Sequence, residues 1–175
     1  ELPQQTGYTL QLMLEQLDEV CGRIKELEKR MQEAFGDDET VKRLQSMPGV
    51  GFILAVVIAG EIGDIGRFGS ASRLASYCGM VPRVHASGGK VRHGRTRSDA
   101  NHYLKWAFSE AGNSVAVNHK RFPDRHVSDL YRRLRSRKGH SVAVGAVGRH
   151  LAEVSWYMLS KKQEYLERGV SLSRG

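Results

Sequence analysis

Residues 41–59 read VKRLQSMPGVGFILAVVIA, and the interpretation of the whole chain starts from this stretch. An amphipathic turn of helix leads into Pro48-Gly49-Val50-Gly51, and a second helix rich in Ala and Val follows. The two glycines allow a tight turn and leave amide N–H groups pointing outward at the start of the second helix. This pattern is typical of a helix-hairpin-helix, which holds a DNA phosphate without reading bases. We therefore expect Gly49 and Gly51 to contact DNA. The alternative is an ordinary pair of helices joined by a Pro-Gly turn.

The preceding segment, residues 1–40, is predicted to be a coiled-coil linker helix. Pro3 and Gly7 precede it, and Gly36-Asp37-Asp38 ends it. We expect the chain to form a homo-oligomer through residues 10–34; the alternative is a long helix packed on its own domain. Apolar residues recur in alternating steps of three and four, the 3.5-residue repeat of a coiled-coil seam, at Leu10, Met13, Leu17, Val20, Ile24, Leu27 and Met31, with Ala34 continuing the repeat.

Charge is distributed unevenly along the chain, whose formal net charge is +8. Residues 1–40 carry four basic and ten acidic side chains, whereas the remaining residues carry 23 basic and nine acidic ones, a net charge of +14. A basic body of this size attracts polyanions, of which nucleic acid is the usual one. Arginine dominates the excess, which favours phosphate recognition because its planar fork grips two oxygens at once. A merely solvated basic surface is the alternative.

Residues 41–175 are predicted to form one helical domain. A turn-rich link with one short helical turn is expected where glycines fall at three-residue spacing, residues 60–69. Glu61 and Asp64 could share a helical face there, but no third carboxylate is near to complete a metal site. We expect burial of the aromatic residues Trp106 and Tyr131 rather than stacking on bases. Further helices are expected from Ser70 or Ser72 to Gly79, from Ser98-Asp99 to Gly112-Asn113, around Leu130, Tyr131 and Leu134 up to Lys138-Gly139, and from about Ser141 to Leu166, with Gly145, Ala146 and Gly148 allowing close helix approach.

Length and composition limit the class of protein. A chain of 175 residues with 40% apolar residues suits one globular domain with an appendage. It has no run of 18 apolar residues and no basic-then-apolar leader, so we expect no membrane partner. Cys21 and Cys78 lie far apart and no two histidines stand four residues apart, so neither a disulfide scaffold nor a zincin-type site is predicted. A reducing, cytoplasmic location is the natural interpretation. Because the chain opens with Glu1 and not Met, we expect it to be part of a longer protein.

The most informative region follows Pro82 and reads RVHASGGKVRHGRTR, residues 83–97. Short β-like runs flank Ser87-Gly88-Gly89, so a hairpin or an extended loop is expected there. A Walker phosphate loop is excluded, because Val84 stands where glycine is needed and Val91 stands where Ser or Thr is needed. Taken alone, Ser87 is an ordinary turn serine. Basic residues surround its hydroxyl, namely Lys90, Arg92, Arg95 and Arg97, and His85 and His93 stand close by in sequence.

The order of these parts is informative in its own right. An acidic heptad helix is followed by Met47-Pro48-Gly49-Val50-Gly51, Gly60-Glu61-Ile62-Gly63-Asp64-Ile65, Tyr77-Cys78-Gly79-Met80-Val81-Pro82, Ser87-Gly88 and Asp129-Leu130-Tyr131-Arg132-Arg133-Leu134. This order resembles the C-terminal transposase domain of the IS-one-ten family of insertion-sequence transposases, related to the Piv/MooV DNA invertases. The resemblance covers most of residues 41–168.

The resemblance implies a composite active site. In that family an N-terminal RuvC-like domain supplies an acidic quartet that binds a divalent metal, Mg in our expectation, and the C-terminal domain supplies a serine, which maps onto Ser87. No cofactor is expected in this chain itself, since it lacks the RuvC-like half, and by itself it is expected to bind DNA and do little chemistry. Some family members are guided by a structured RNA. The chain departs from the family pattern at Ala100, where glycine is common, and at Lys105, where arginine is frequent.

These expectations give a specific hypothesis. Ser87 attacks a DNA phosphodiester, and His85 is a candidate base on the same strand face. The residues expected to contact DNA phosphates are Gly49, Gly51, Arg83, Lys90, Arg92, Arg95, Arg97 and Lys105. Two rival functions are a non-enzymatic helix-hairpin-helix module that binds nucleic acid, and an assembly scaffold that dimerises through residues 10–34. The expected fold is all-α, with a small hairpin or irregular insertion near residues 83–97.

Overall fold

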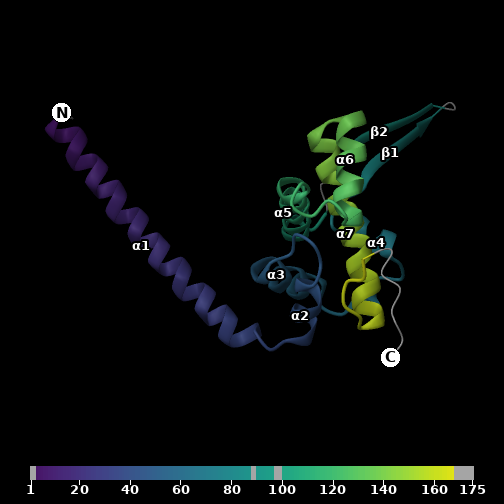
Figure 1. Ribbon diagram of the computed structural model, residues 1–175, viewed down its shortest axis with the longest axis horizontal. Helices are drawn as coiled ribbons and strands as arrows, with labels where there is room; N and C mark the ends of the chain where they lie inside the picture. Colours follow the sequence, from purple (N-terminus) through teal and green to yellow (C-terminus); the bar gives the residue numbers. More distant parts are fainter. Residues whose placement is uncertain (1–2, 88–89, 97–99, 168–175) are drawn as a thin grey trace. The chain divides into compact units, whose positions relative to one another are not determined.

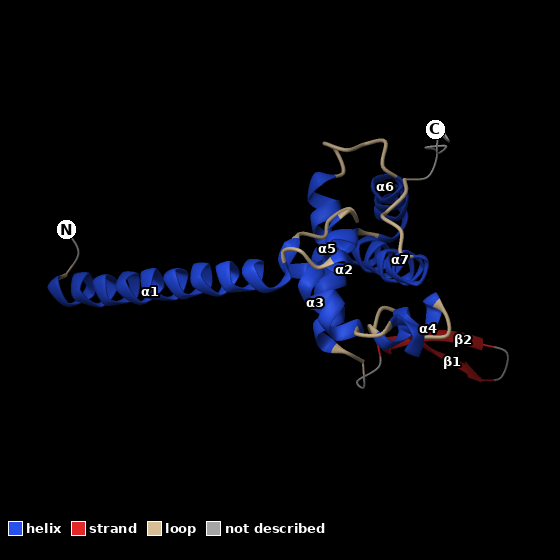
Figure 2. Ribbon diagram, turned by 90° about the horizontal axis from the view of Figure 1, so that it is seen from below, coloured by secondary structure: helices blue, strands red, loops and turns tan. Residues whose placement is uncertain are grey.

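The structure is a computed structural model of the chain, and it describes residues 3–87, 90–96 and 100–167 (Figure 1). The chain divides into two compact units, residues 1–38 and 39–175. Within the described residues there are seven α-helices, one 3-10 helix and one two-stranded sheet, so the all-α fold class is confirmed (Figure 2). Among these helices, none combines the length and the hydrophobicity that crossing a bilayer requires.

The first unit is essentially one helix, α1 (Gln4–Phe35). It begins before Gly7, which was expected to precede it, and it ends at Gly36 as expected. Ion pairs between residues four apart reinforce it, including Arg23 with Glu19 at 2.5 Å and Arg30 with Glu26 at 2.5 Å. The apolar heptad positions are largely exposed; Leu17, for example, exposes 57% of its surface. Helix α1 therefore carries a stripe of exposed apolar side chains.

The second unit opens with the predicted pair of helices, α2 (Glu39–Gln45) and α3 (Phe52–Ile62). The turn between them depends on Gly49, whose φ is +83°. A Cβ at this position would collide with the carbonyl oxygen of Ala111, so glycine is needed both for the backbone angle and for close packing. Gly51 differs, because its φ is −85° and a Cβ there would meet open space. The expectation that both glycines tighten the turn is therefore correct for Gly49 alone.

The link after α3 contains η1 (Ile65–Arg67), where the Asp64 side chain accepts a hydrogen bond from the Gly66 N–H at 2.9 Å. Helix α4 (Ala71–Tyr77) then begins at Ser70, whose hydroxyl accepts from the Arg73 N–H. The strands β1 (Pro82–Ser87) and β2 (Lys90–Thr96) pair in antiparallel fashion, and the register is irregular between Pro82 and Val84. The expected hairpin insertion is thus present.

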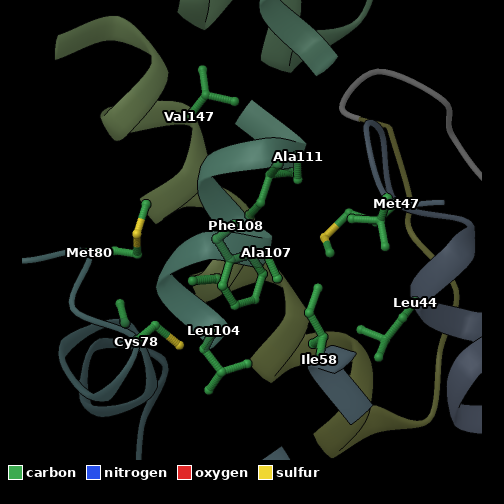
Figure 3. Packing of buried hydrophobic residues seen from close by; sticks show 14 of the residues in the cluster. Leu44, Met47, Ile58, Cys78, Met80, Leu104, Ala107, Phe108, Ala111 and Val147 are labelled. Atoms are coloured by element: carbon green, nitrogen blue, oxygen red, sulfur yellow. The ribbon is translucent and has the colours of Figure 1, made fainter. Parts of the chain in front are cut away.

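Three longer helices complete the unit: α5 (His102–Asn118), α6 (His126–Lys138) and α7 (His140–Lys161). Helix α7 contacts α4, α5 and α6, and α3 packs on α5. Side chains from four helices meet around α5 in the core: Leu44 of α2, Ile58 of α3, Phe108 of α5 and Val147 of α7 (Figure 3). All four are fully buried. Burial of this apolar surface is the main force that holds the helices together.

Helices α5 and α7 approach closely because each presents a glycine to the other. A Cβ on Gly148 would lie 2.7 Å from the Phe108 carbonyl oxygen, and one on Gly112 would lie 2.8 Å from the Val144 carbonyl oxygen. Such distances are too short for a real side chain, so both positions require glycine. A Cβ on Gly145 would instead meet open space. The expectation of close helix approach is therefore confirmed at Gly148 and wrong at Gly145.

Two helices, α5 and α7, have boundaries that differ from the expected ones. The expected start of α5 at Ser98-Asp99 falls on residues outside the described ones, and the helix begins at His102 with Asn101 as its cap. It also continues past Gly112 to Asn118, because Gly112 packs against α7 instead of ending the helix. Helix α7 ends at Lys161 and not at Leu166, since Lys162 adopts a left-handed conformation.

Candidate nucleic-acid interface

The β1–β2 hairpin carries most of the residues expected at the site. Its register pairs Ser87 with Lys90 and His85 with Arg92, so the candidate nucleophile lies at the last described pair before the end of the hairpin. Arg83 lies on β1 and Arg95 on β2. The side chains of residues 82–99 lie outside what the structure describes, and so does Arg97 altogether. For these residues the structure gives backbone pairing only.

The two chain segments that lead into and out of the hairpin are fastened together. The Asn101 N–H donates to the Tyr77 carbonyl oxygen at 2.9 Å, which joins the start of α5 to the end of α4. Gly79, with a φ of +67°, packs so closely on Ala100 that a Cβ there would lie 2.7 Å from the Ala100 methyl group. The chain segments on either side of the hairpin are therefore packed closely against each other within the helical domain.

A partly buried polar network reinforces this close packing. The Asn101 side chain accepts from the Leu104 N–H at 2.9 Å and donates to the Glu61 carboxylate at 2.6 Å. The Tyr77 hydroxyl lies 3.4 Å from the same amide nitrogen. The Arg67 guanidinium lies over the Tyr77 ring, 5.0 Å from its centroid, and donates to the Glu61 carbonyl oxygen at 3.1 Å. This network links α3, η1, α4 and α5.

Sequence reasoning missed this network. From the sequence, Glu61 is considered only together with Asp64, as part of an incomplete metal site. The structure instead gives the Glu61 carboxylate a hydrogen-bonding partner in Asn101. The two residues are 40 positions apart, so no local pattern could have paired them. The one available signal was the Asn at the start of a helix, which indicates a cap. Lys105, expected to contact phosphate, lies half-buried in the first turn of α5, with its aliphatic stem beside Gly79.

The α2–α3 turn forms a second candidate contact. Gly51 is the N-cap of α3, its conformation is extended, and no side chain caps the helix. The first amide N–H groups of a helix have no intrahelical acceptor, so those at the start of α3 are available to an anion. Gly49, Gly51 and the first turn of α3 line an open groove of about 460 Å³, which Trp106 and Glu110 of α5 complete.

Trp106 is exposed, contrary to its expected burial, whereas Tyr131 is buried as expected. Trp106 exposes 47% of its surface and Tyr131 only 2%. The Tyr131 hydroxyl hydrogen-bonds His140 Nδ1 at 2.8 Å, which explains how a polar aromatic residue is accommodated inside. Tyr131 is thus unavailable for stacking on a base. Trp106 presents its ring at the groove beside the start of α3.

Two further features bear on chemistry. Cys78, immediately before the close-packed Gly79, is fully buried, and this burial raises the pKa of its thiol to about 12. It is therefore an unreactive, structural residue. Among the described residues, no group of three or more His, Cys, Asp or Glu side chains is placed to hold a metal ion.

Comparison with known proteins places the chain in a family. The profile of the transposase IS116/IS110/IS902 family matches residues 41–127. A Pseudomonas aeruginosa protein named "Probable family 20 transposase" is 28% identical over 164 residues, which are 94% of this chain and 48% of the relative. The transposase for insertion sequence element IS1111A of Coxiella burnetii is 28% identical over 148 residues, 85% of this chain and 40% of that protein. The transposase for insertion sequence element IS1328 of Yersinia enterocolitica is 37% identical over 71 residues, 41% of this chain and 21% of that protein.

The chain therefore belongs to the IS116/IS110/IS902 family of transposases, which is the IS-one-ten family that its sequence resembles. The matched residues include the α2–α3 turn, the hairpin and the capping Asn101. The chain spans about half the length of the Pseudomonas relative and less of the other two.

Proposed function

We propose that the chain is the part of a transposase that binds DNA and supplies a serine nucleophile, Ser87, for DNA strand breakage and rejoining. The observation that carries this proposal is the hairpin register, in which Ser87 is paired with Lys90. This pair lies within residues 83–97, a segment with five basic and no acidic residues. Membership of a transposase family supports DNA as the substrate. The full-length protein, with its RuvC-like domain, is the proposed enzyme.

The proposed step conserves the energy of the broken bond. The Ser87 Oγ attacks phosphorus, an Oγ–P bond forms, and the bond from phosphorus to one sugar oxygen breaks. The proton leaves Oγ for a base, and the departing sugar oxygen takes up a proton to become a free hydroxyl. The reverse attack by a sugar hydroxyl then reseals a strand. No net oxidation or reduction occurs, so the balance is complete with DNA and protein alone.

Basic residues of the hairpin stabilise the transition state in this proposal. Lys90, Arg92, Arg95 and Arg97 offset the negative charge that builds on the non-bridging phosphate oxygens. Arg83 and Lys105 contribute phosphate contacts at the base of the hairpin. His85 is a candidate proton acceptor. A RuvC-like domain, when loaded with Mg, supplies further charge stabilisation at the same phosphate, but the roles of the hairpin residues do not depend on that metal.

The α2–α3 turn is the proposed second DNA contact. A phosphate bound by the uncapped amides of α3 would hold the duplex in a sequence-independent manner, because backbone groups contact no base edge. The absence of a side-chain cap at Gly51 supports this assignment. We also propose that α1 mediates homo-oligomerisation, since its apolar heptad positions are exposed in the single chain.

The test of the nucleophile uses the full-length protein with the Ser87→Ala substitution. Excision and integration of the element should be lost, while DNA affinity stays within about twofold, because a hydroxyl is removed but no charge is. Normal rates of excision by the variant would overturn the assignment. A non-enzymatic binding module, the rival function, would never give a covalent protein–DNA adduct.

A further inference from the structure

Helix α6 and the loop before it form a second strongly basic surface that the proposed DNA contacts do not use. Residues 119–139 carry eight basic and two acidic side chains, a net charge of +6. The profile match ends at residue 127, and α6 runs from His126 to Lys138, so almost all of this helix lies beyond the matched residues. Its charge is therefore a feature of this chain that the family match does not address.

Helix α6 has a buried apolar side and several exposed basic side chains. Val127 and Tyr131 are buried on the side that packs against α7. Arg133 and Arg137 are four residues apart, so they lie one helical turn from each other on the same face, away from Tyr131. Arg135 and Lys138 follow Tyr131 on its own side of the helix, beyond the last buried residue, and both are exposed. The C-terminal half of α6 thus carries cations around much of its circumference, which are Arg132, Arg133, Arg135, Arg137 and Lys138.

Part of this charge is paired with a carboxylate and part of it is not. Asp129 pairs with Arg133 at 2.9 Å and lies 3.5 Å from Arg132, which also donates to the Pro123 carbonyl oxygen. In the part of the chain that the structure describes, no carboxylate pairs with Arg135, Arg137 or Lys138.

Stability of the helix alone does not explain the pattern. Three cations in the last turn of α6 interact favourably with its macrodipole, at about 0.3–1 kcal/mol for each. That effect falls off within one turn, so it does not extend to Arg132 and Arg133, which contact Asp129 instead. The macrodipole also does not account for the basic residues of the preceding loop. There Arg121 and Arg125 both lie over the Phe122 ring, with guanidinium-to-centroid distances of 5.3 and 4.1 Å. Those two guanidinium groups add to the basic charge next to α6.

We propose that the basic C-terminal half of α6, residues 132–138, binds the sugar-phosphate backbone of duplex DNA, as a contact separate from the hairpin and from the α2–α3 turn. This inference rests on the proposed function, which makes DNA the substrate. Arginine forks suit phosphate oxygens, and a cluster of exposed cations at the end of a helix needs no base contact to hold a duplex. The role of this cluster is to add affinity for the duplex backbone.

The test measures binding of this chain to a 30-base-pair duplex of arbitrary sequence, by fluorescence anisotropy across a salt series. The variant carries Arg135→Gln, Arg137→Gln and Lys138→Gln, which removes three charges without using the cations that hold Asp129 or Pro123. We expect affinity to fall at least tenfold at about 0.1 M salt, and the slope of log K against log salt to become shallower by about 2 to 3.

Matched variants separate a local contact from net charge and from misfolding. Arg23→Gln, Lys25→Gln and Lys29→Gln on α1 remove the same three charges, and this control should keep the wild-type slope. The double variant Arg135→Lys with Arg137→Lys retains the charges on α6, so it should also keep the wild-type slope. If the guanidinium groups had a structural role instead, lysine would not replace them. Circular dichroism at the assay temperature checks that each variant is folded.

The remaining outcomes overturn the inference in distinguishable ways. If the wild-type chain binds the duplex and the α6 variant has the same slope, the inference is wrong and the proposed function stands. If the α6 variant loses affinity for a double-stranded RNA of equal length but not for DNA, the occupant is RNA and the inference is also wrong. If the wild-type chain binds no duplex DNA, the DNA-binding part of the proposed function fails together with it.

Discussion

The Asn101 side-chain amide donates to the Glu61 carboxylate at 2.6 Å while its carbonyl oxygen caps α5 through the Leu104 N–H at 2.9 Å. One side chain thus uses a donor and an acceptor at once, which suits an amide. Through the Asn101 N–H and the Tyr77 carbonyl oxygen, the same residue also closes the base of the hairpin that carries Ser87. The geometry explains why Asn stands at the start of α5.

Exchanging the two functional groups tests this relationship. Asn101→Asp keeps the helix cap but sets a second carboxylate against Glu61, so we expect a loss of about 2–3 kcal/mol in the free energy of unfolding. Glu61→Gln with Asn101→Asp lets the glutamine amide donate to the new carboxylate, and it should recover most of that loss. Urea unfolding followed by tryptophan fluorescence is the measurement, because Trp106 and Trp156 both lie in the second unit.

The control for this cycle is Glu61→Gln alone, in which the amide oxygen still accepts from Asn101. It should cost about 1 kcal/mol or less. A double variant no more stable than Asn101→Asp, which would mean a coupling energy near zero, would show that the hydrogen bond is incidental.

Two glycines of α7 are expected to respond to alanine with opposite signs. At Gly148 a methyl group would collide with the Phe108 carbonyl oxygen and with Met80, so Gly148→Ala should destabilise the protein by about 2–3 kcal/mol. At Gly145 the methyl group meets open space, so Gly145→Ala should stabilise it by about 0.5–1 kcal/mol through helix propensity. Thermal unfolding of both variants decides the matter, and equal shifts would mean that α5 and α7 do not approach as described.

The amides at the start of α3 give a prediction in which stability and DNA affinity move in opposite directions. Gly51 has the extended conformation of an N-cap, so Gly51→Ser supplies a hydroxyl that accepts from the first-turn amides and should add a few tenths of a kcal/mol. The same hydroxyl occupies the groups that we propose hold a phosphate, and DNA affinity should fall several-fold.

Gly51→Ala is the matched control, because it adds a methyl group and leaves those amides open. It should bind DNA like the wild type although alanine is a poor N-cap. Equal DNA affinity of the serine and alanine variants, measured on the same duplex, would remove the α3 amides from the interface.

The apolar stripe of α1 predicts concentration-dependent association. Leu17 lies on the heptad seam and is 57% exposed in the single chain, so Leu17→Lys should place charges in a dimer interface and shift sedimentation toward the monomer. Leu12 is also exposed but lies off the seam, and Leu12→Lys should associate like the wild type. A wild-type chain that stays monomeric at all concentrations, or two variants with the same behaviour, would argue against the seam.

Local sequence patterns predicted the secondary-structure elements of this fold, because the turns and caps that bound these elements depend on neighbouring residues. The Pro-Gly turn, Ser70 as a cap and the basic hairpin were all found from a few neighbouring residues. Boundaries failed where distant packing decides them. Gly112 appeared to be a helix end, but it lies inside α5 because it lets α7 approach.

The hairpin that carries the candidate site was predicted from the sequence, whereas the contacts that support it were not. Basic residues around Ser87 are visible in one short stretch, and the antiparallel register agrees with a hairpin there. The Glu61–Asn101 hydrogen bond joins residues 40 positions apart, and the exposure of Trp106 follows from which face of α5 its neighbours cover. Both depend on tertiary packing, which a single sequence does not reveal.

The most direct measurement of the central claim is the trapping of a covalent intermediate. Full-length protein is incubated with DNA that carries the element end and a label on each strand, and the mixture is resolved under denaturing conditions. The account predicts a labelled protein–DNA adduct whose attachment maps, after proteolysis and mass spectrometry, to Ser87, and which is missing from Ser87→Ala. An adduct that persists in that variant, or strand cleavage with no adduct at any time, would contradict it.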